Sequence, residues 1–430
     1  MKIELQGQEF KYITEDSKKC DSNTAFVLTN QNKKYAEDAK HNNAHSLINI
    51  KDIAEYFGID KIKIIGITGT NGKTTTASAI YSFLLDLGYK VAIQGTRGLF
   101  MNDELLEGKT LTTPSVLNTY KNIYQAVASG CEFFIMEVSS HAIVQQRIEG
   151  LNFELKILTN ITQDHLDYHK TLEEYIAVKN SFFQDESKKL INKDETNAKF
   201  NFHNTYTYGI ENPATYRLMA YSLNDGLSGI IQYFKEIIPF TASLHGFFNL
   251  YNIMAAISAT HLITDKSLEE IANVVDNFGG VSGRMEQVSA VPNVIVDFAH
   301  TPDGMSQVLN TLKEKELIVV FGAGGDRDRL KRPLMGKVAV SYAKKVIVTS
   351  DNPRYEDPDR IISDILKGIE DKTNVIVELD RRKAIEVALN IQEDEDVVVI
   401  LGKGDETEQI IYDKKFAFDD RKVVKELLNI

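Results

Sequence analysis

A glycine-rich segment at residues 68–75 (TGTNGKTT) has the composition of a phosphate-binding loop. Glycine lets backbone N–H groups approach a phosphate closely, and a following lysine can reach the terminal phosphates. Gly72 and Lys73 stand in that order, and the hydroxyl of Thr74 can hold Mg²⁺. The strict motif requires glycine where this chain has Ile67. We prefer a nucleoside triphosphate site to an ordinary glycine-rich turn, because a predicted strand precedes the segment and a predicted helix follows it.

An acidic residue and a histidine stand at the ends of two other predicted strands. Glu137 lies in the apolar run 133–138, and His165 follows the run 156–159. The carboxyl ends of parallel strands are where α/β proteins collect their sites, so both side chains are expected at one edge of a sheet. Magnesium prefers oxygen ligands, and a single histidine is more often a hydrogen-bonding residue. For the pair in this context we favour a shared Mg²⁺.

Two polar segments have the composition of a site for a charged sugar-peptide. One covers residues 111–114 (LTTP), and the other covers residues 139–147 (SSHAIVQQR). Serine and threonine hydroxyls form adaptable hydrogen bonds, and arginine can bind a carboxylate with two parallel bonds. Taken alone, a Thr-Thr-Pro sequence is equally well explained as a turn.

A turn at residues 349–354 (TSDNPR) presents an arginine from a stiff backbone. Pro353 fixes its own φ and disfavours a helix at Asn352, so Arg354 follows a rigid bend. A planar guanidinium held in this way suits a carboxylate. Without further information, a surface turn with a solvated arginine is the commoner arrangement.

The elements that position these residues are short, branched apolar runs, which are typical of buried parallel strands. The run 63–67 precedes the glycine-rich segment and a helical pattern at 76–87 follows it, as at the beginning of an α/β nucleotide-binding domain. From residue 284 the alternation restarts as a second doubly wound unit. Further strands are predicted at 25–29, 133–138, 156–159, 189–192, 294–298, 317–321, 345–349, 374–378 and 397–401, and further helices at 50–57, 172–183 and 249–263.

We therefore predict an α/β protein with three domains. Residues 1–60 form a small N-terminal α/β domain, residues 61–283 form a central domain with a parallel or mixed sheet around the phosphate loop, and residues 284–430 form a doubly wound, Rossmann-like domain. A length of 430 residues suits two or three domains. The apolar content of 43% and charged content of 26% are ordinary for a globular protein.

The charge and the cysteine content exclude several classes of protein. A net charge of −12 argues against a nucleic-acid coat protein or a basic membrane-surface protein. Two cysteines are too few for a disulfide framework and suit a reducing compartment. The first ten residues lack the apolar core of a signal peptide, and no apolar run approaches the roughly 18 residues of a membrane span. We expect a cytoplasmic monomer with no nucleic-acid or membrane partner.

The segment 68–75 resembles the nucleotide loop of the Mur ligases and their folylpolyglutamate synthetase relatives, which depart from the strict spacing at the same point. The segments around Glu137 and His165 resemble the family's acidic strand end and its Asp-His-Leu-Asp motif. The resemblance implies that both residues bind a second Mg²⁺ and that Lys179 carries a carbamate, whose negative charge can lie close to Mg²⁺. The ATP contacts that it implies are Gly69, Thr70, Asn71, Gly72, Lys73, Thr74, Thr75, Asn249, Arg284, Asp297 and His300.

The two polar segments resemble the branch of the family that uses UDP-N-acetylmuramoyl-L-alanyl-D-glutamate. The resemblance assigns Thr112, Thr113, Ser139, Gln145 and Arg147 to that substrate. Residues 16–18 (DSK) resemble an Asp-Ser-Arg triplet that contacts uridine, which assigns Ser17 to this group. The implied reaction forms an amide through an acyl phosphate, at the expense of ATP, in peptidoglycan precursor synthesis.

The segment Asp-Asn-Pro-Arg resembles the motif of ligases that add meso-diaminopimelate, whereas ligases that add lysine lack this arginine. The guanidinium would attract the second carboxylate of diaminopimelate and repel the lysine ammonium. In a related loop, the usual Gly-Lys-Gly-His-Glu reads Gly-Lys-Gly-Asp-Glu, with Asp405 in place of histidine. The resemblance assigns to the amino acid Arg327, Asp351, Asn352, Arg354, Gly402 and Glu406.

Three alternatives remain open at this point. A folylpolyglutamate synthetase shares the loop and the mechanism but needs neither the Thr-Thr-Pro nor the Asp-Asn-Pro-Arg segment. A lysine-adding ligase would differ in the added amino acid. A non-catalytic ATP-binding regulator on the same scaffold would not need the complete set of Lys73, Glu137, His165 and Lys179.

Overall fold

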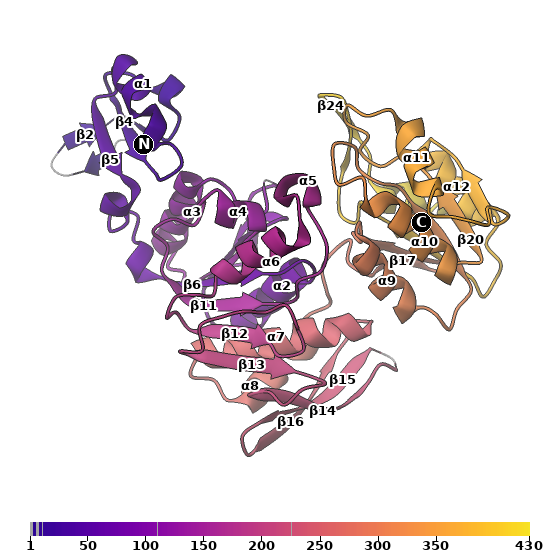
Figure 1. Ribbon diagram of the computed structural model, residues 1–430. Coiled ribbons are helices and arrows are strands. Elements are labelled where there is room, and N and C mark those ends of the chain that lie inside the picture. Colours follow the sequence, from indigo (N-terminus) through magenta and orange to yellow (C-terminus); the bar gives the residue numbers. More distant parts are fainter. Residues whose placement is uncertain (1–2, 6–7, 11, 110, 225) are drawn as a thin grey trace.

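The computed structural model describes residues 3–5, 8–10, 12–109, 111–224 and 226–430. Three parts of the chain follow one another in space as they do in sequence. In Figure 1 the N-terminal part and the C-terminal part flank a larger central part on opposite sides. Each part contains a main sheet of its own, and no strand pairing joins the three main sheets among the described residues.

The N-terminal part is a three-stranded parallel sheet with short helical turns. Its strands are β3 (Tyr12–Thr14), β4 (Thr24–Leu28) and β5 (Ser46–Asn49), in the order β3-β4-β5. The strand expected at 25–29 is therefore confirmed as β4. The remaining elements are the hairpin β1 (Ile3–Leu5) and β2 (Gln8–Phe10), α1 (Ala36–His41), and the 3₁₀ turns η1 (Ser17–Lys19), η2 (Lys33–Tyr35), η3 (Ile50–Ile53) and η4 (Ile59–Lys61).

The helix predicted at 50–57 is wrong. The chain forms only the 3₁₀ turn η3 and then a series of turns that ends at Gly58, whose φ is +66°. The side chain of Asn49 makes no capping hydrogen bond, so the N-terminus of a longer helix would lack a cap. Ile50, Ile53 and Phe57 are all buried, and this apolar spacing had suggested a helix.

The central part is built on an eleven-stranded sheet with the order β16-β15-β14-β13-β12-β11-β6-β10-β7-β8-β9. The strands from β14 to β7 in this order pair in parallel, and antiparallel strands extend both edges. The bounds are β6 (Lys63–Thr68), β7 (Val91–Gly95), β8 (Gly98–Met101), β9 (Glu104–Glu107), β10 (Phe133–Glu137), β11 (Phe153–Leu158), β12 (Lys189–Asn192), β13 (Thr205–Gly209), β14 (Tyr216–Ser222), β15 (Leu227–Tyr233) and β16 (Glu236–Ala242).

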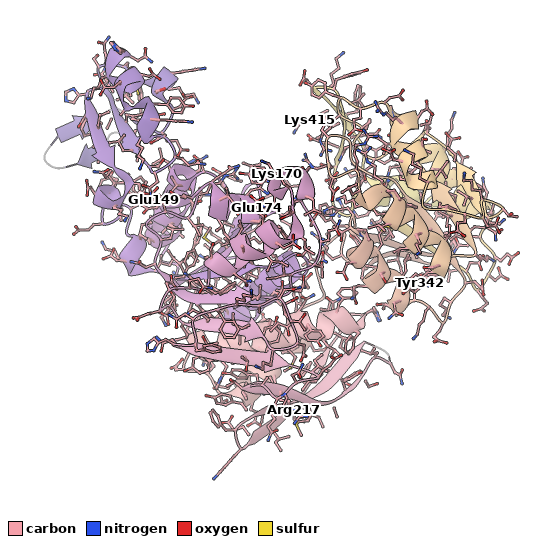
Figure 2. All side chains as sticks on the ribbon, in the orientation of Figure 1. Glu149, Lys170, Glu174, Arg217, Tyr342 and Lys415 are labelled. Carbon is pink, nitrogen blue, oxygen red and sulfur yellow. The ribbon has the colours of Figure 1, made fainter. Side chains whose placement is uncertain are left out.

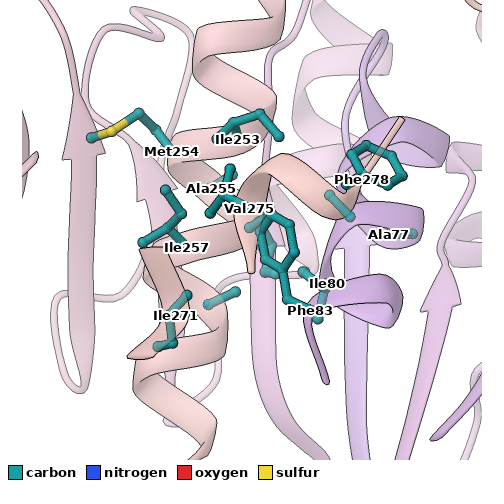
Figure 3. Packing of buried hydrophobic residues seen from close by; sticks show 14 of the residues in the cluster. Ala77, Ile80, Phe83, Ile253, Met254, Ala255, Ile257, Ile271, Val275 and Phe278 are labelled. Carbon is teal, nitrogen blue, oxygen red and sulfur yellow. The ribbon is translucent and has the colours of Figure 1, made fainter. Parts of the chain in front are cut away.

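Helices cover both faces of this sheet. Successive side chains of a strand point to opposite faces, so strands that are apolar throughout give the sheet two apolar faces that must be buried. Ile65 and Ile67 of β6 pack under α2 (Lys73–Asp86) and α7 (Phe247–Ile263). Figure 3 shows Phe83 and Ile80 of α2 close to Phe278 and the residues of α7. Residues of the opposite face pack against α3 (Val116–Ala128) and α6 (Leu172–Ser181), and the shorter elements are α4 (Ser140–Val144), α5 (Leu166–His169), α8 (Leu268–Ala272) and η5 (Val275–Asn277).

The C-terminal part is a doubly wound unit, as predicted. Its sheet has the order β17-β18-β22-β19-β20-β21, with only the edge strand β17 antiparallel. One core lies under α9 to α11 and a second core lies under α12 and α13. The bounds are β17 (Glu286–Ala290), β18 (Asn293–Asp297), β19 (Leu317–Phe321), β20 (Lys345–Val348), β21 (Val375–Val377), β22 (Val397–Leu401), the hairpin β23 (Glu408–Ile411) and β24 (Lys414–Ala417), and α9 (Pro302–Thr311), α10 (Lys331–Tyr342), α11 (Pro358–Leu366), α12 (Arg381–Asn390) and α13 (Asp420–Leu428).

We keep 1–60, 61–283 and 284–430 as our proposed domain division, because each main sheet lies inside one of these ranges. The first two domains touch where the backbone N–H of Asn30 donates to Glu149, which Figure 2 labels, over 2.8 Å. Across the described part of the chain, every helix is too short or too polar to span a bilayer.

Candidate active site

The glycine-rich segment lies between β6 and α2, as the sequence predicted, and β6 is an inner strand of the sheet. The helix begins at Lys73, three residues earlier than expected, because Gly72 takes a left-handed φ of +83° and turns the chain directly into it. The Lys73 ammonium donates to the carbonyl oxygens of Gly69 (2.8 Å) and Thr70 (3.0 Å). The lysine thus lies over the loop, at the place where a helix N-terminus attracts phosphate.

Groups that follow the neighbouring strand β11, together with a tyrosine of α6, hold the loop in its conformation. The backbone N–H of Asn71 donates to the Asn160 side chain over 2.9 Å. The Thr70 hydroxyl lies 3.0 Å from the carbonyl oxygen of Thr162 and 3.1 Å from the hydroxyl of Tyr175. The loop is therefore shaped before any ligand arrives, which reduces the entropy lost on binding.

Glu137 ends β10 beside the loop and is almost completely buried. Its carboxylate accepts hydrogen bonds from the Thr74 hydroxyl (2.9 Å) and from the backbone N–H (2.9 Å) and hydroxyl (3.2 Å) of Thr96. A carboxylate in contact with a threonine hydroxyl is an oxygen donor pair that fits Mg²⁺. Among the described residues, no three His, Cys, Asp or Glu side chains are grouped so that they could hold a metal ion. Further ligands would therefore have to come from a nucleotide or from water.

His165 occupies a strained left-handed position at φ +54°. Its Nε2 lies 3.4 Å from one carboxylate oxygen of Asp164, and the other oxygen of that carboxylate lies 3.6 Å from the ammonium of Lys331 in the C-terminal domain. Burial lowers the pKa of His165, against the opposing charge of Asp164. The imidazole is consequently neutral at neutral pH, the form in which histidine binds metals.

Lys179 points from α6 to the underside of the phosphate loop. It is 1% exposed, and its ammonium donates to the carbonyl oxygen of Gly69 over 2.8 Å. Burial, and then the charge of Lys73, hold the pKa of Lys179 well below its usual value. A lysine with a lowered pKa is an amine that can react with carbon dioxide, so its chemistry fits a carbamate.

Four of the residues assigned to the sugar-peptide form one hydrogen-bonded group. The hydroxyl of Thr113 donates to the backbone oxygen of Glu137 (2.9 Å) and accepts from the N–H of Ser139 (3.0 Å). The Arg147 guanidinium donates to the carbonyl oxygen of Thr113 (2.8 Å) and to the Gln145 side chain (2.9 Å). This group therefore ties the Thr-Thr-Pro turn to the end of the strand that carries the acidic residue.

Thr112 lies next to this group, whereas Ser17 lies in another domain. The Thr112 hydroxyl is 3.1 Å from the hydroxyl of Thr96. Ser17 begins η1 of the N-terminal domain, where its carbonyl oxygen accepts a bond from Asn42 over 3.0 Å.

Two arginines of the C-terminal domain lie close enough for their charges to interact. The Arg354 guanidinium donates to the carbonyl oxygens of Gly325 (2.8 Å) and Asn352 (3.4 Å), and Arg327 donates to the carbonyl oxygen of Asp326 (3.0 Å). Burial, and then the charge of Arg327, lower the pKa of Arg354. Within the described ranges, neither guanidinium forms an ion pair with a carboxylate, so a ligand carboxylate would find both charges available.

Asn352 and Glu406 meet beside these arginines. The amide nitrogen of Asn352 donates to the Glu406 carboxylate over 2.9 Å. The buried ammonium of Lys403 donates to the same carboxylate (2.8 Å) and to the amide oxygen of Asn352 (3.1 Å). Gly402 has a φ of +113°, and a Cβ there would lie 2.8 Å from the carboxylate of Asp351. This part of the site is tightly packed.

The residues assigned to the rest of the nucleotide lie near the boundary of the two larger domains. The Arg284 guanidinium lies over the Phe298 ring, 4.2 Å from its centre, and Asp297 accepts bonds from two backbone N–H groups. The Nδ1 of His300 lies 2.9 Å from the carbonyl oxygen of Phe298, and burial lowers its pKa. Asn249 is buried, and its side-chain amide nitrogen donates to the backbone carbonyl oxygen of His245.

A cavity of about 670 Å³ joins these separate groups across the boundary between the central and C-terminal domains. The predicted residues that line it are Thr70, Asn71, Gly72, Lys73, Thr74, Thr75, Thr112, Glu137, His165, Arg284, Asp297, His300, Arg327, Asp351, Asn352, Arg354, Gly402 and Glu406. The predicted residues outside this wall are Ser17, Gly69, Thr113, Ser139, Gln145, Arg147, Lys179 and Asn249. The cavity therefore combines the phosphate loop with the arginine pair.

Comparison with known proteins identifies the family. A family model described as Mur ligase middle domain matches residues 67–260, and one described as Mur ligase, glutamate ligase domain, matches residues 283–404. A relative from Wolinella succinogenes is 53% identical over 99% of this chain and 98% of its own length. The chain belongs to the Mur ligase family. This relative, and one from Helicobacter pylori that is 51% identical over 93% of this Mur ligase and 91% of its own length, are named UDP-N-acetylmuramoyl-L-alanyl-D-glutamate–2,6-diaminopimelate ligase.

Solved structures agree with this assignment. A structure of the same name is 31% identical to this Mur ligase, covers 100% of it and 97% of its own chain, and has a TM-score of 0.68. A folylpolyglutamate synthase from Mycobacterium tuberculosis, at 15% identity, covers 81% of this Mur ligase and 90% of its own chain with a TM-score of 0.67. At that identity, the second likeness shows a common fold alone.

Sequence reasoning missed several residues of the Mur ligase site. Thr96 holds Glu137, but it follows a strand that was not predicted and no motif pointed to it. Asn160 and Asp164 lie inside the segment 159–169 that contains His165, so their polar character at a strand end was an available signal. Lys403 lies in the Gly-Lys-Gly-Asp-Glu segment, so a signal was available, but its role depends on contacts with residues that are distant in sequence, such as Asn352.

Proposed function

We propose that this Mur ligase adds meso-diaminopimelate to UDP-N-acetylmuramoyl-L-alanyl-D-glutamate, with ATP as the energy source, during synthesis of a peptidoglycan precursor. The observation that carries the proposal is that one cavity is lined both by the phosphate loop and by Arg327 and Arg354. The names of relatives at 51–53% identity support the same reaction.

The reaction proceeds in two displacements. The D-glutamate carboxylate attacks the γ-phosphorus of ATP, and ADP leaves, which gives an acyl phosphate. The amine of diaminopimelate then attacks the acyl carbon, loses a proton and expels phosphate. Lys73 stabilises the charge on the transferring phosphoryl group. The fixed loop holds this group in line with the attacking carboxylate. Mg²⁺ held by Thr74, Glu137 and His165 would neutralise phosphate charge when bound.

We also propose that Lys179 carries a carbamate. Carbamylation replaces the ammonium group of Lys179 with an anion, which removes its charge repulsion with Lys73. The lowered pKa of Lys179 supports this modification, because burial and the charge of Lys73 favour a neutral, reactive amine, and the contact with the Gly69 carbonyl oxygen places that amine beside the phosphate loop. The anion would orient the lysine or the metal ion nearby.

Arg354 is proposed to select the added amino acid. Its guanidinium donates only to carbonyl oxygens among the described residues, so it can also donate to and bind the second carboxylate of diaminopimelate. The ammonium of lysine would be repelled at the same place by Arg354 and Arg327. Arg354 follows the bend at Pro353 and has a φ of +52°. Its backbone N–H donates to the carbonyl oxygen of Ile410, and its carbonyl oxygen accepts from the N–H of Tyr412.

A two-substrate assay of ADP release tests the proposal. We expect ADP only when the sugar-dipeptide and diaminopimelate are both present, and at least about 30-fold lower kcat/KM with lysine. Arg354→Met should remove most of this preference and leave the melting temperature nearly unchanged. Equal kcat/KM for both amino acids in the unmodified enzyme contradicts the role of Arg354.

The other candidates correspond to different results of the same assay. A folylpolyglutamate synthetase would release ADP with a folate and glutamate, and a regulator would bind ATP without turnover. We further propose that the enzyme acts as a cytoplasmic monomer without a nucleic-acid or membrane partner. Sedimentation of the purified enzyme would test the monomer.

A further inference from the structure

An ion-pair group joins the C-terminal domain to the central domain at one edge of the cavity. The carboxylate of Asp405, 9% exposed, lies 3.0 Å from the ammonium of Lys109 and 3.9 Å from the guanidinium of Arg97. The Lys109 ammonium also donates to the backbone oxygen of Asp405 over 2.6 Å. One residue of the C-terminal domain thus contacts two cations of the central domain.

The two cations stand at the two ends of one hairpin. Arg97 directly precedes β8 and Lys109 follows β9, so Asp405 bridges the base of the hairpin. Thr96, next to Arg97, holds Glu137 and contacts Thr112. Any displacement of the hairpin base would therefore move residues beside the phosphate loop and the sugar-peptide site.

On the side of the C-terminal domain, Asp405 is also next to a residue of the proposed site. Glu406, which bonds to Asn352, directly follows Asp405. The backbone of the same loop presses against the connection between the domains, where a Cβ on Gly283 would lie 2.1 Å from the N–H nitrogen of Asp405. The nearby cation Arg421 already pairs with Asp419 (2.7 Å) and Glu286 (3.5 Å). Lys109 and Arg97 are consequently the partners of Asp405 across the boundary.

We infer that Asp405 is a positioning residue that clamps the loop 402–406 onto the hairpin 98–107, so that the binding site for the incoming amino acid stays assembled beside the phosphate loop. This inference rests on the proposed function, and it gives a role to the residue that stands where the family motif has histidine. An imidazole could not provide the same constant negative charge to two cations.

The test uses the full-length enzyme with Asp405→Asn, Lys109→Met and the double variant. Each single change should raise the KM for diaminopimelate about tenfold and leave kcat within about twofold, because the pair acts through position and not on the reacting atoms. The double variant should lose less than the product of the two single effects, since both changes remove the same ion pair between Asp405 and Lys109. Multiplied effects in the double variant would overturn the inference.

Two controls separate the clamp from a general loss of stability. Lys121→Met removes an ion pair with Glu107 (3.2 Å) on the same hairpin, but both partners belong to the central domain. This variant should behave as the unmodified enzyme does. Asp405→Glu, which keeps the charge, should recover most of the lost affinity.

Hydrogen exchange gives a readout that needs no turnover. In Asp405→Asn the backbone amides of residues 98–109 should exchange about tenfold faster than in the unmodified enzyme, and Lys121→Met should not change them. Unchanged exchange in Asp405→Asn would refute the clamp. If the unmodified enzyme releases no ADP with both substrates, the proposed function fails, while the exchange comparison still decides about the clamp.

Discussion

Arginines and lysines of this protein differ in what they contact, and the difference separates structural residues from binding residues. The fully buried Arg381 has a carboxylate partner, Asp420, at 2.8 Å. Arg332, also fully buried, pairs with Glu356 and Asp364. Arg354, in contrast, donates to backbone carbonyls and faces the cavity. Buried charges are normally paired, so an arginine without a carboxylate on a cavity wall indicates a ligand with negative charge.

Lys179 is a buried lysine that donates to a backbone carbonyl oxygen, and a substitution tests whether it acts in the reaction. We expect Lys179→Ala to lower kcat about hundredfold, because the group below the phosphate loop no longer positions its neighbours. Short carboxylates such as acetate should restore part of the activity, since they can occupy the place of the carbamate. The measurement is the rate of ADP release at increasing acetate concentration.

Lys189 provides a matched control for this rescue. It is fully buried, and its ammonium also donates to backbone carbonyls, those of Ser187 (2.7 Å) and His203 (3.0 Å), but it stands at the beginning of β12 and makes no contact with the phosphate loop among the described residues. Acetate should not change the activity of Lys189→Ala. Full activity of Lys179→Ala without any carboxylate would remove the carbamate from the proposal.

At the scale of elements, the strand β6, the phosphate loop and the helix α2 form the unit that carries ATP chemistry. Strand and helix are recognisable from local periodicity, and the glycines explain the tight connection between them. The outer strands β13 to β16 were not predicted, because they alternate polar and apolar residues over short lengths and depend on pairing with one another. The helix expected at 50–57 was wrong for a related reason, since apolar spacing without a cap does not define a helix.

Gly72→Ala tests the tight connection. A Cβ at this position would lie 2.3 Å from the side-chain oxygen of Asn252, and φ is +83°. We expect the KM for ATP to rise about tenfold or more, because the loop must shift to relieve the contact. Steady-state kinetics with ATP as the varied substrate measures the effect.

Gly88→Ala at the other end of α2 is the control for backbone strain alone. Its φ is +89°, but a Cβ there meets nothing within 4 Å. This variant should lose about 1–2 kcal/mol of unfolding free energy and keep its KM for ATP. An equal rise of KM in both variants would show that strain, and not the contact with Asn252, governs nucleotide binding.

At the scale of the whole molecule, the cavity of the proposed active site is lined by residues of both the central and the C-terminal domain. Asp303 at the beginning of α9 accepts a bond from Asn71 of the phosphate loop (2.9 Å) and another from Thr162 (3.3 Å). Lys331 of α10 lies near Asp164 of the central domain. These contacts hold the proposed amino-acid site close to the proposed nucleotide site, so we expect domain arrangement and catalysis to be coupled.

Asp303→Ala should weaken this arrangement. We expect the KM for ATP to increase about five- to tenfold, since the loop loses one charge-assisted hydrogen bond, and the radius of gyration in X-ray scattering to increase as the domains separate. Asp359→Ala is the control, because Asp359 also lies in the first turn of a helix in this domain but is exposed to solvent. A changed KM in Asp359→Ala, or an unchanged one in Asp303→Ala, would contradict the coupling.

The amino-acid sequence by itself determined the parts whose chemistry is local: the phosphate loop with Lys73, the rigid turn before Arg354, and the α/β character of both larger domains. Short-range spacing carries this information, since glycine, proline and apolar periodicity act on their own neighbours. Only the tertiary structure decided that Thr96 holds Glu137 and that Asp405 reaches Lys109. These pairs are separated by 41 and 296 residues, so no local pattern can encode them. Contacts of this kind depend on how the sheets and domains pack, which is a property of the folded chain as a whole.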